Sequence, residues 1–274
     1  MIQSLLRSME ILEILKENSH KYSIAELAER TSLPPSTVHR ILQTFCDMNY
    51  VLRDDSAHTY ELGPALISLG RAAASNFRIQ NAAAPILRQL SSSTREDTYL
   101  IIQSSDKGLV LVKQDGPNHL KVVEEFGYEM DLHCGAIRKV LLAYQSEAYI
   151  NYYLDTRLDR PEAFPQISRR ALELELEQIR RDGVAVTHGE YVHDAAGIGA
   201  PVYGPDNKVI ASIGLVAPYS RIPNEKHLEK LMEDVKNAAF ENDDNNGSRC
   251  QGPVEREDDN EKDAAEQERR QVSR

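Results

Sequence analysis

Residues 23–45 contain the pattern that most restricts how this chain can fold, two short amphipathic helices separated by a tight turn. Ser23 and Glu26 have the spacing of a capping box, so the first helix begins there. Pro34 and Pro35 suit the first turn of a second helix, where a missing N–H group costs little. The second helix has apolar residues with one-face helical spacing, at Val38, Ile41, Leu42 and Phe45. The pattern predicts a helix-turn-helix.

The opposite face of the second helix is polar. It carries hydroxyls, an amide, an imidazole and a guanidinium, at Ser36, Thr37, His39, Arg40, Gln43 and Thr44. Such groups can bond phosphate oxygens and the base edges of a major groove. The alternative is a face that is only solvated, because two short helices joined by a turn occur in many folds.

A β-hairpin is predicted directly after the helix pair. Residues 50–53 and 58–62 have strand character, and 54–57 have the composition of a turn. A further helix, capped by Ser4, is expected before the pair, with apolar side chains packed behind it at Leu5, Met9, Leu12 and Leu15. Together these elements make a winged helix-turn-helix, in which Arg53 and His58 would face phosphates or a minor groove. The alternative is a hairpin that only covers one edge of a small core.

Residues 64–95 are predicted to form a helical linker between two domains. Helices are expected at 65–74 and 85–94, with Pro85 at the start of the second. Such a linker can present an apolar stripe to a second subunit, with candidate contacts at Leu62, Leu66 and Leu69. Packing within one chain explains these leucines at least as well.

Residues 96–240 are predicted to form an α+β domain with a largely antiparallel sheet, because strands, then helices, then strands follow one another. The expected strands are 98–103, 109–114, 120–125, 183–188, 198–204 and 208–217. The expected helices are 136–145, 146–154, 168–182 and 223–240. The turn at 204–207 joins the last two strands as a hairpin.

The formal net charge of −11 argues against nucleic acid as a partner, but the charge is unevenly distributed. Residues 241–274 hold eleven acidic and six basic residues and almost no apolar ones, so this tail is predicted to be disordered. Residues 1–75 hold seven basic and nine acidic residues and are therefore not basic either. DNA affinity would depend on the local placement of Arg40 and Arg53 and on a second subunit, and would fall with salt.

Cysteine usage and hydropathy favour a cytoplasmic protein. Cys46, Cys134 and Cys250 form no CxxC pair and no disulfide framework. No segment has the roughly 18 uninterrupted apolar residues of a membrane helix. Several residues of types that bind zinc occur without a diagnostic spacing, at His133, Cys134, His188, His193 and Asp194. We therefore expect no membrane association, no metal and no cofactor.

A glycine-rich segment at 127–136 precedes the helix expected to begin near Ala136. The N–H groups at a helix N-terminus attract anions, including carboxylates. A ligand site at this N-terminus would contain His133, Cys134 and Gly135. Gly197 and Gly214 would leave room for a small ligand. Turns and tight strand packing explain such glycines equally well.

Motifs in both halves of the chain resemble the IclR family of bacterial transcriptional regulators. The recognition-helix pattern is Leu33-Pro-x-Ser36-Thr37-Val38-x-Arg40-Ile41-Leu42, and the end of the wing is Tyr60-x-Leu62-Gly63. The second domain contains the similar motifs Leu132-His133, Lys139-x-Leu-Leu-Ala143, Gly199-Ala-Pro-Val202 and Pro218-x-x-Arg221. The resemblance extends over about residues 1–240.

The resemblance implies a winged-helix DNA-binding domain over 1–63 and a GAF-like effector-binding domain over 96–240. It also implies ligand positions in the second domain, at Ala136, Ile137, Thr187, Gly197, Gly214 and Val216. Asp131, Gly135 and Arg138 stand where the family usually has proline, a small hydroxyl residue and glycine. The effector is then either less polar than usual or an anion held by backbone groups and Arg138.

The combined prediction is a DNA-binding regulator, with a repressor favoured on the resemblance alone. A homodimer or homotetramer is expected, because one recognition helix gives little specificity and paired half-sites multiply it. The expected partners are double-stranded operator DNA and a small-molecule effector, for which a carboxylate is one candidate class.

Two other classes of function stay open. An enzyme would use Cys134 as nucleophile with His188 or His193 as base, but no nucleophile elbow or phosphate-binding loop accompanies them. A protein-interaction module would use the helix-turn-helix only as a scaffold. The sequence favours a regulator over an enzyme.

Overall fold

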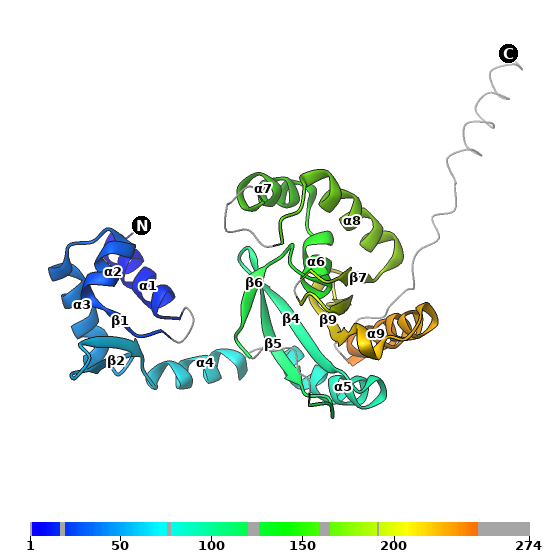
Figure 1. Ribbon diagram of the computed structural model, residues 1–274, viewed down its shortest axis with the longest axis horizontal. Helices are drawn as coiled ribbons and strands as arrows, with labels where there is room; N and C mark the ends of the chain where they lie inside the picture. Colours follow the sequence, from blue (N-terminus) through cyan, green and yellow to red (C-terminus); the bar gives the residue numbers. More distant parts are fainter. Residues whose placement is uncertain are drawn as a thin grey trace, which may run out of the picture. The chain divides into compact units, whose positions relative to one another are not determined.

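The chain divides into two units, residues 1–77 and 78–274. These are called the N-terminal unit and the C-terminal unit. In both units helices begin at capping serines that the sequence contains, such as Ser23 and Ser168. The computed structural model describes residues 2–16, 20–75, 78–119, 126–158, 165–190 and 192–245 (Figure 1). The described helices include none with both the length and the apolar character that crossing a membrane requires.

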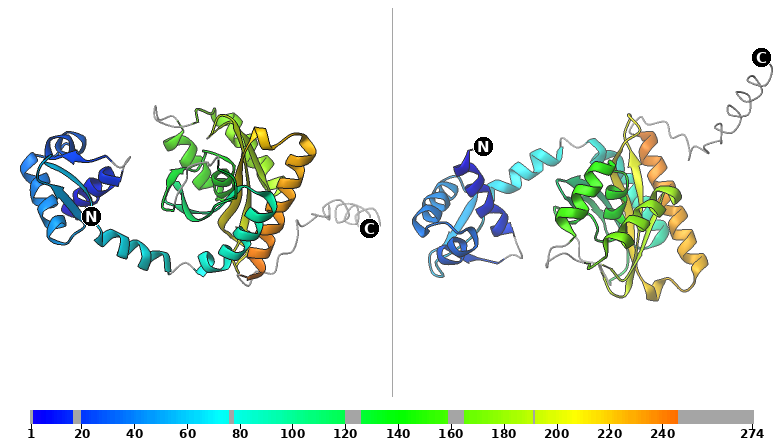
Figure 2. Two further views of the ribbon diagram at one scale, coloured as in Figure 1. Left: turned by 60° about the horizontal axis from the view of Figure 1, so that its bottom comes forward. Right: turned by 90° about the horizontal axis from the view of Figure 1, so that it is seen from above.

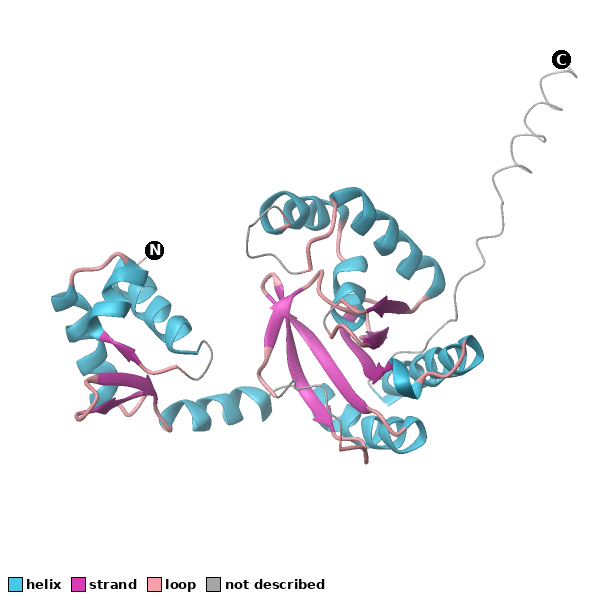
Figure 3. Ribbon diagram, in the orientation of Figure 1, coloured by secondary structure: helices cyan, strands magenta, loops and turns pink. Residues whose placement is uncertain are grey.

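The N-terminal unit is a winged helix-turn-helix, as predicted. Its elements are α1 (Gln3–Lys16), β1 (Tyr22–Ser23), α2 (Ile24–Thr31), α3 (Pro35–Asp47), β2 (Val51–Asp54), β3 (Thr59–Leu62) and α4 (Ala65–Ser75). The three strands form an antiparallel sheet in the order β1-β3-β2 (Figure 3).

The capping box at the start of α2 is confirmed. Glu26 donates its backbone N–H to Ser23 Oγ at 3.3 Å, and Ser23 donates its own N–H to Glu26 Oε2 at 2.8 Å. The helix ends at Thr31, and the left-handed backbone of its C-cap residue Ser32 (φ 52°) lets the chain turn before Pro34. The short turn therefore follows from local chemistry that the sequence already displays.

The buried face of α1 agrees with the predicted one only in the second half of the helix, where Leu15 is buried and Leu12 packs against the core. Leu5 and Met9 are each 55% exposed, whereas Ile11, Ile14 and Leu15 are buried in the core with Leu27 and Phe45 of the helix pair, among others. The helix carries apolar residues on more than one face, so periodicity alone does not identify the packed one. The small core takes up only the C-terminal half of α1.

The C-terminal unit contains one six-stranded antiparallel sheet in the order β6-β5-β4-β9-β8-β7. Its strands are β4 (Asp97–Ser104), β5 (Lys107–Gln114), β6 (Glu129–Asp131), β7 (Ala185–His188), β8 (Ala195–Tyr203) and β9 (Val209–Pro218). Its helices are α5 (Arg78–Thr94), α6 (Ala136–Ala143), α7 (Glu147–Arg157), α8 (Arg169–Asp182) and α9 (Glu225–Asn245), with a 3-10 turn, η2 (Tyr219–Arg221). The predicted α+β class and the predicted 204–207 hairpin are confirmed.

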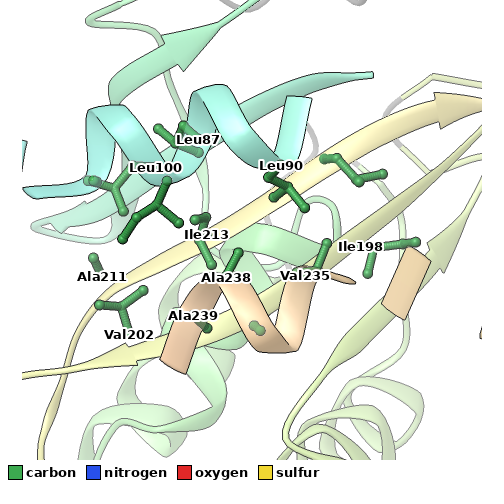
Figure 4. Packing of buried hydrophobic residues seen from close by; sticks show 14 of the residues in the cluster. Leu87, Leu90, Leu100, Ile198, Val202, Ala211, Ile213, Val235, Ala238 and Ala239 are labelled. Atoms are coloured by element: carbon green, nitrogen blue, oxygen red, sulfur yellow. The ribbon is translucent and has the colours of Figure 1, made fainter. Parts of the chain in front are cut away.

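The two faces of this sheet support separate cores. Leu100 and Ile102 of β4 belong to one cluster, and the alternating residues Tyr99 and Ile101 belong to the other. Helices α5 and α9 cover the first face (Figure 2). Figure 4 shows side chains of both helices meeting those of the strands there. Helix α6 packs on the second face, and α7 and α8 add to the same core.

Several predicted boundaries differ from the structure. Helix α5 begins at Arg78, seven residues before Pro85, which the sequence placed at its start. Pro85 and Asn81, the residue one turn earlier, are both exposed, so water can satisfy the carbonyl that proline leaves without a donor. Strand β6 lies inside the segment that was predicted to be a glycine-rich loop. The predicted strand at 120–125 lies outside the described residues.

The C-terminal end of the fold also differs. Helix α9 continues to Asn245, five residues into the segment 241–274 that was predicted to be disordered. The remainder of that segment lies outside the described residues. The division between the units falls inside the predicted linker 64–95, and α5 packs into the core of the C-terminal unit.

A buried ion pair ties the end of β9 to the start of β4. Arg221 in η2 donates Nε to Glu96 Oε1 at 2.5 Å and also donates Nη2 to Glu96 Oε2. The Glu96 side chain is 4% exposed and the Arg221 side chain 26%. Hydrogen bonding to Glu96 raises the pKa of Arg221 above its usual value. The Pro218-x-x-Arg221 motif therefore has a structural role.

Arg221→Ala should lower the free energy of unfolding by about 3 kcal/mol, because it leaves the Glu96 carboxylate in the core without its guanidinium. Urea unfolding of the full chain measures this loss. The control Arg170→Ala removes an arginine that is 74% exposed and should cost less than about 0.5 kcal/mol. Equal losses in the two variants would contradict the role of the ion pair.

Candidate functional site

The packing of α3 turns its polar face outward. Val38 and Leu42 are fully buried and Phe45 is 9% exposed, so this side of the helix is held in the core. The predicted DNA-binding residues on α3 are exposed except for the half-buried Thr37, namely Ser36, His39, Arg40, Gln43 and Thr44. The amphipathic pattern thus presents these side chains together on one helix face.

Helices α1 and α3 border a groove of about 310 Å³ that contains two arginines, Arg7 and Arg40. Hydroxyl groups and two apolar side chains complete its lining, from Ser4, Ser8, Thr37, Ile41, Thr44 and Phe45. Sequence reasoning did not identify Arg7, because no local motif places α1 beside α3. Two cations among hydroxyl groups suit a phosphate of the DNA backbone.

The wing has a turn that is formed by its own side chains. The carboxylate Oδ1 of Asp54 accepts hydrogen bonds from the backbone N–H groups of Ser56 and Ala57 and from Ser56 Oγ. These bonds, led by that from the Ser56 hydroxyl, lower the pKa of Asp54. His58 follows in the left-handed conformation and is exposed. The two predicted wing contacts, Arg53 and His58, are thus held on a defined hairpin.

Arg53 is paired with a neighbouring carboxylate. Its Nε lies 3.0 Å from Asp55 Oδ1, and the two side chains are 43% and 86% exposed. Exposed pairs of this kind contribute little to stability. Arg53 can therefore exchange Asp55 for a phosphate group at small cost.

A small cavity of about 20 Å³ lies in the C-terminal unit at the N-terminal turn of α6. It is lined by residues of α6, β7, β8, β9 and the turn after β7, namely Gly135, Ala136, Ile137, Arg138, Thr187, Glu190, Val192, Ala195, Gly197 and Val216. The lining includes six of the nine predicted effector positions, brought together from four separate segments of the chain. A cavity of this size holds about one water molecule.

The other three predicted effector positions lie outside this lining. His133 and Cys134 are fully buried, and His133 Nδ1 is 2.8 Å from the hydroxyl oxygen of Tyr153. Burial raises the pKa of the Tyr153 hydroxyl, so this group stays protonated. A Cβ atom on Gly214 would lie 2.7 Å from Ile137 Cγ1, so that glycine serves close packing.

The first N–H groups at the N-terminus of α6 are bonded to side chains of the protein. Ala136 donates its N–H to Thr187 Oγ1 at 3.1 Å, and Gly135 donates to Glu190 Oε2 at 3.3 Å. Gly135 is the N-cap residue and has a positive φ of 77°, which favours glycine over the usual hydroxyl residue. Thr187 and Glu190 thus take the place of a side-chain cap.

Lys139 lies one turn further along α6 and is enclosed by carboxylates. Its side chain is 1% exposed, and its ammonium bonds Glu190 Oε1 at 2.6 Å and also Glu175 of α8. Arg138 borders the cavity, is 3% exposed, and lies 6.0 Å from the ring centre of Tyr128. Sequence reasoning missed Glu190 as a lining residue, since its contacts join positions more than fifty residues apart.

The residues considered as zinc ligands or as catalytic groups have other surroundings in the structure. The rings of His188 and Tyr219 stack with their centres 6.2 Å apart. Across the part of the chain that the structure describes, no three histidine, cysteine, aspartate or glutamate side chains gather where they could hold a metal ion. Cys134, the nucleophile of the enzyme hypothesis, is fully buried.

Thr187→Val should lower the free energy of unfolding by about 1–3 kcal/mol, because the Ala136 N–H loses its acceptor in a buried position. Urea unfolding of the full chain gives the value. The control Thr156→Val removes an exposed hydroxyl on α7 and should change stability by less than about 0.5 kcal/mol. Similar values for the two variants would show that Thr187 does not cap α6.

Comparison with known proteins matches both units of the chain to one family. Residues 4–55 match the IclR helix-turn-helix domain, and residues 71–243 match the family described as bacterial transcriptional regulator IclR C-terminal. The HTH-type transcriptional regulator XynR of Escherichia coli K12 is 27% identical over 240 residues, which cover 87% of this chain and 95% of XynR. The DNA-binding transcriptional repressor YiaJ of the same strain is 28% identical over 244 residues, 86% of each chain.

The fold is also found in solved structures. An IclR homolog from Microbacterium hydrocarbonoxydans, complexed with 4-hydroxybenzoate, superposes with a TM-score of 0.74 and 21% identity. The match covers 89% of this chain and 99% of that one. The two domain matches together show that the chain belongs to the IclR family, and it is a DNA-binding transcriptional regulator of the helix-turn-helix type.

Proposed function

We propose that this regulator is a repressor whose operator binding is controlled by a small-molecule effector in the α6 cavity. The observation that carries the proposal is the cavity itself, because it unites six positions predicted for the effector, five from the family resemblance and Gly135 from its place at a helix N-terminus. A ligand there contacts α6 and three strands at once, so it can favour one arrangement of the C-terminal unit over another. Repression is supported by the name of the relative YiaJ.

The proposed DNA contacts are the exposed residues of α3 and of the wing. Ser36, His39, Arg40, Gln43 and Thr44 reach the bases or phosphates of a major groove, together with the half-buried Thr37. Arg53 and His58 contact the backbone beside it, and Arg7 joins Arg40 at a phosphate. The protein acts in the cytoplasm by binding DNA rather than by catalysis, since the one candidate nucleophile, Cys134, lies outside the cavity and is buried.

The proposed effector is a small carboxylate. A carboxylate ligand, 4-hydroxybenzoate, is named for the solved homolog with the same fold. In this chain the cavity borders the N-terminal turn of α6, which favours an anion. The Arg138 side chain lies beside Gly108 and carries its guanidinium over the Tyr128 ring.

The proposed assembly is a homodimer or homotetramer. Large apolar side chains are exposed on two helices of the N-terminal unit, Ile2, Leu5, Leu6 and Met9 at α1 and Ile67 and Leu69 on α4. An apolar surface of this kind is typical of protein contacts. A second copy would cover it and would place two recognition helices on paired half-sites.

Arg40→Ala should weaken binding to the operator by about 1–3 kcal/mol if the guanidinium makes a bidentate contact with a guanine. Footprinting of the DNA beside the protein's own gene locates the operator, and titration at fixed salt gives the affinity. The control Arg170→Ala removes the same charge from α8 and should leave the affinity unchanged. Unchanged affinity of the Arg40 variant would remove that residue from the interface.

Val216→Phe should abolish the response to the effector while DNA binding persists. The half-buried Val216 lines the cavity, so a phenyl ring there fills the space the ligand needs. The measurement is operator affinity with and without a metabolite that alters the footprint of the wild type. Ile210→Phe on the same strand is the control, since Ile210 is 41% exposed and lies outside the cavity lining. A folded Val216 variant that responds like the wild type would place the effector elsewhere.

A further inference from the structure

The carboxylate of Glu190 occupies the position at the start of α6 where an anion would bind. Its Oε2 accepts the N–H of Gly135, and its Oε1 accepts from the ammonium of Lys139. Glu190 belongs to the turn between β7 and β8 and forms part of the cavity wall. A helix N-terminus and a buried cation prepare this position for negative charge, and the protein fills it with a side chain of its own.

Lys139 can release Glu190 without becoming an isolated buried charge. Its ammonium is paired with two carboxylates, Glu190 and Glu175. Glu175 stands on α8, is 42% exposed, and lies outside the cavity lining. When Glu190 leaves, the ammonium keeps Glu175, so the full penalty of breaking a buried pair does not arise.

We propose that Glu190 is an internal stand-in for the effector carboxylate, and that a small monocarboxylate binds by displacing it from Gly135 and Lys139. The exchange replaces one negative charge with another, so the charge around Lys139 is unchanged. A carboxylate that entered beside Glu190 would meet a like charge at close range, which is unfavourable. This inference rests on the proposed function, since it specifies the ligand class of the same cavity and the residue that selects it.

Displacement also explains how so small a cavity can take a metabolite. The volume of about 20 Å³ exists while Glu190 forms part of the wall. Val192 lines the same cavity and belongs to the same turn, so outward movement of Glu190 enlarges the space. The turn is bonded to the end of β9, because Tyr219 donates its backbone N–H to the carbonyl of Asp194. Through this hydrogen bond, movement of the turn on ligand binding reaches the backbone at the start of β8 and at the end of β9.

The test is chemical rescue of the full-length Glu190→Ala variant by acetate. Removal of the side chain vacates the anion position, and acetate should fill it. The expected result is a saturable rise in melting temperature, about 2–4 °C when acetate is at roughly five times its Kd. Acetamide, which has the same shape without the charge, should give no saturable rise. Sodium chloride at equal ionic strength corrects for the general effect of salt.

Three further proteins make the result specific. The wild type keeps Glu190 as a competitor and should need a higher acetate concentration than Glu190→Ala for the same rise, and Glu177→Ala, which removes an exposed carboxylate of α8, should respond like the wild type. Glu175→Ala removes the other partner of Lys139 outside the cavity. An acetate response of that variant equal to that of Glu190→Ala would assign the effect to Lys139 alone and overturn the proposal.

A second variant covers the case in which Glu190→Ala does not fold. Glu190→Gln keeps the shape of the side chain and removes its charge, so acetate should still displace it and stabilise the protein. Absence of a saturable acetate response in whichever of these variants folds overturns the inference. The proposed function fails separately, if the folded Val216→Phe variant keeps a normal effector response while acetate still rescues Glu190→Ala.

Discussion

The close approach of α6 to the middle of the sheet is the constraint on which the C-terminal unit depends. A Cβ atom on Gly199 would lie 2.6 Å from Ile137 Cα, and one on Gly214 would lie 2.7 Å from the Ile137 side chain. Helix and strands therefore meet backbone against backbone, which only glycine allows. This contact brings the N-terminus of α6 to the ends of β7, β8 and β9. It also leaves the cavity little volume while the wall residues stay in place.

That approach has an electrostatic consequence. Because α6 packs so closely on the sheet, the residues that follow its N-terminal turn are buried in the core. One of them is Lys139, whose side chain is 1% exposed. A buried ammonium needs carboxylates, and these come from α8 and from the turn after β7. The ion pairs thus connect the helix layer to the same turn that lines the cavity. In the proposed effector site, structural charge pairing and ligand recognition would therefore use the same few groups.

Local elements of this protein were predictable from sequence, and contacts between distant segments were not. The capping box at Ser23 and the polar face around Arg40 follow from spacing within one helix, and the structure shows both. The packed side of α1 was predicted correctly at Leu12 and Leu15 but not at Leu5 and Met9, because Leu5 and Ile11 are equally apolar and only the tertiary core distinguishes them. Five of the six predicted cavity positions came from family resemblance, and Gly135 came from its place at a helix N-terminus. Glu190 could not be found in that way, because its role depends on a fold that brings it to Lys139 across fifty residues.

The acidic composition of the N-terminal unit does not prevent DNA binding, because its carboxylates are used elsewhere. Glu26 caps α2, Asp54 shapes the wing turn, and Glu61 lies 3.2 Å from Lys21. On α3 the one acid is Asp47 at its C-terminal end, where it accepts a hydrogen bond from Gln43. The recognition face is therefore free of negative charge along most of its length. With so few cations in each copy, a single unit gains little from phosphates, which supports the proposal that two recognition helices bind one operator.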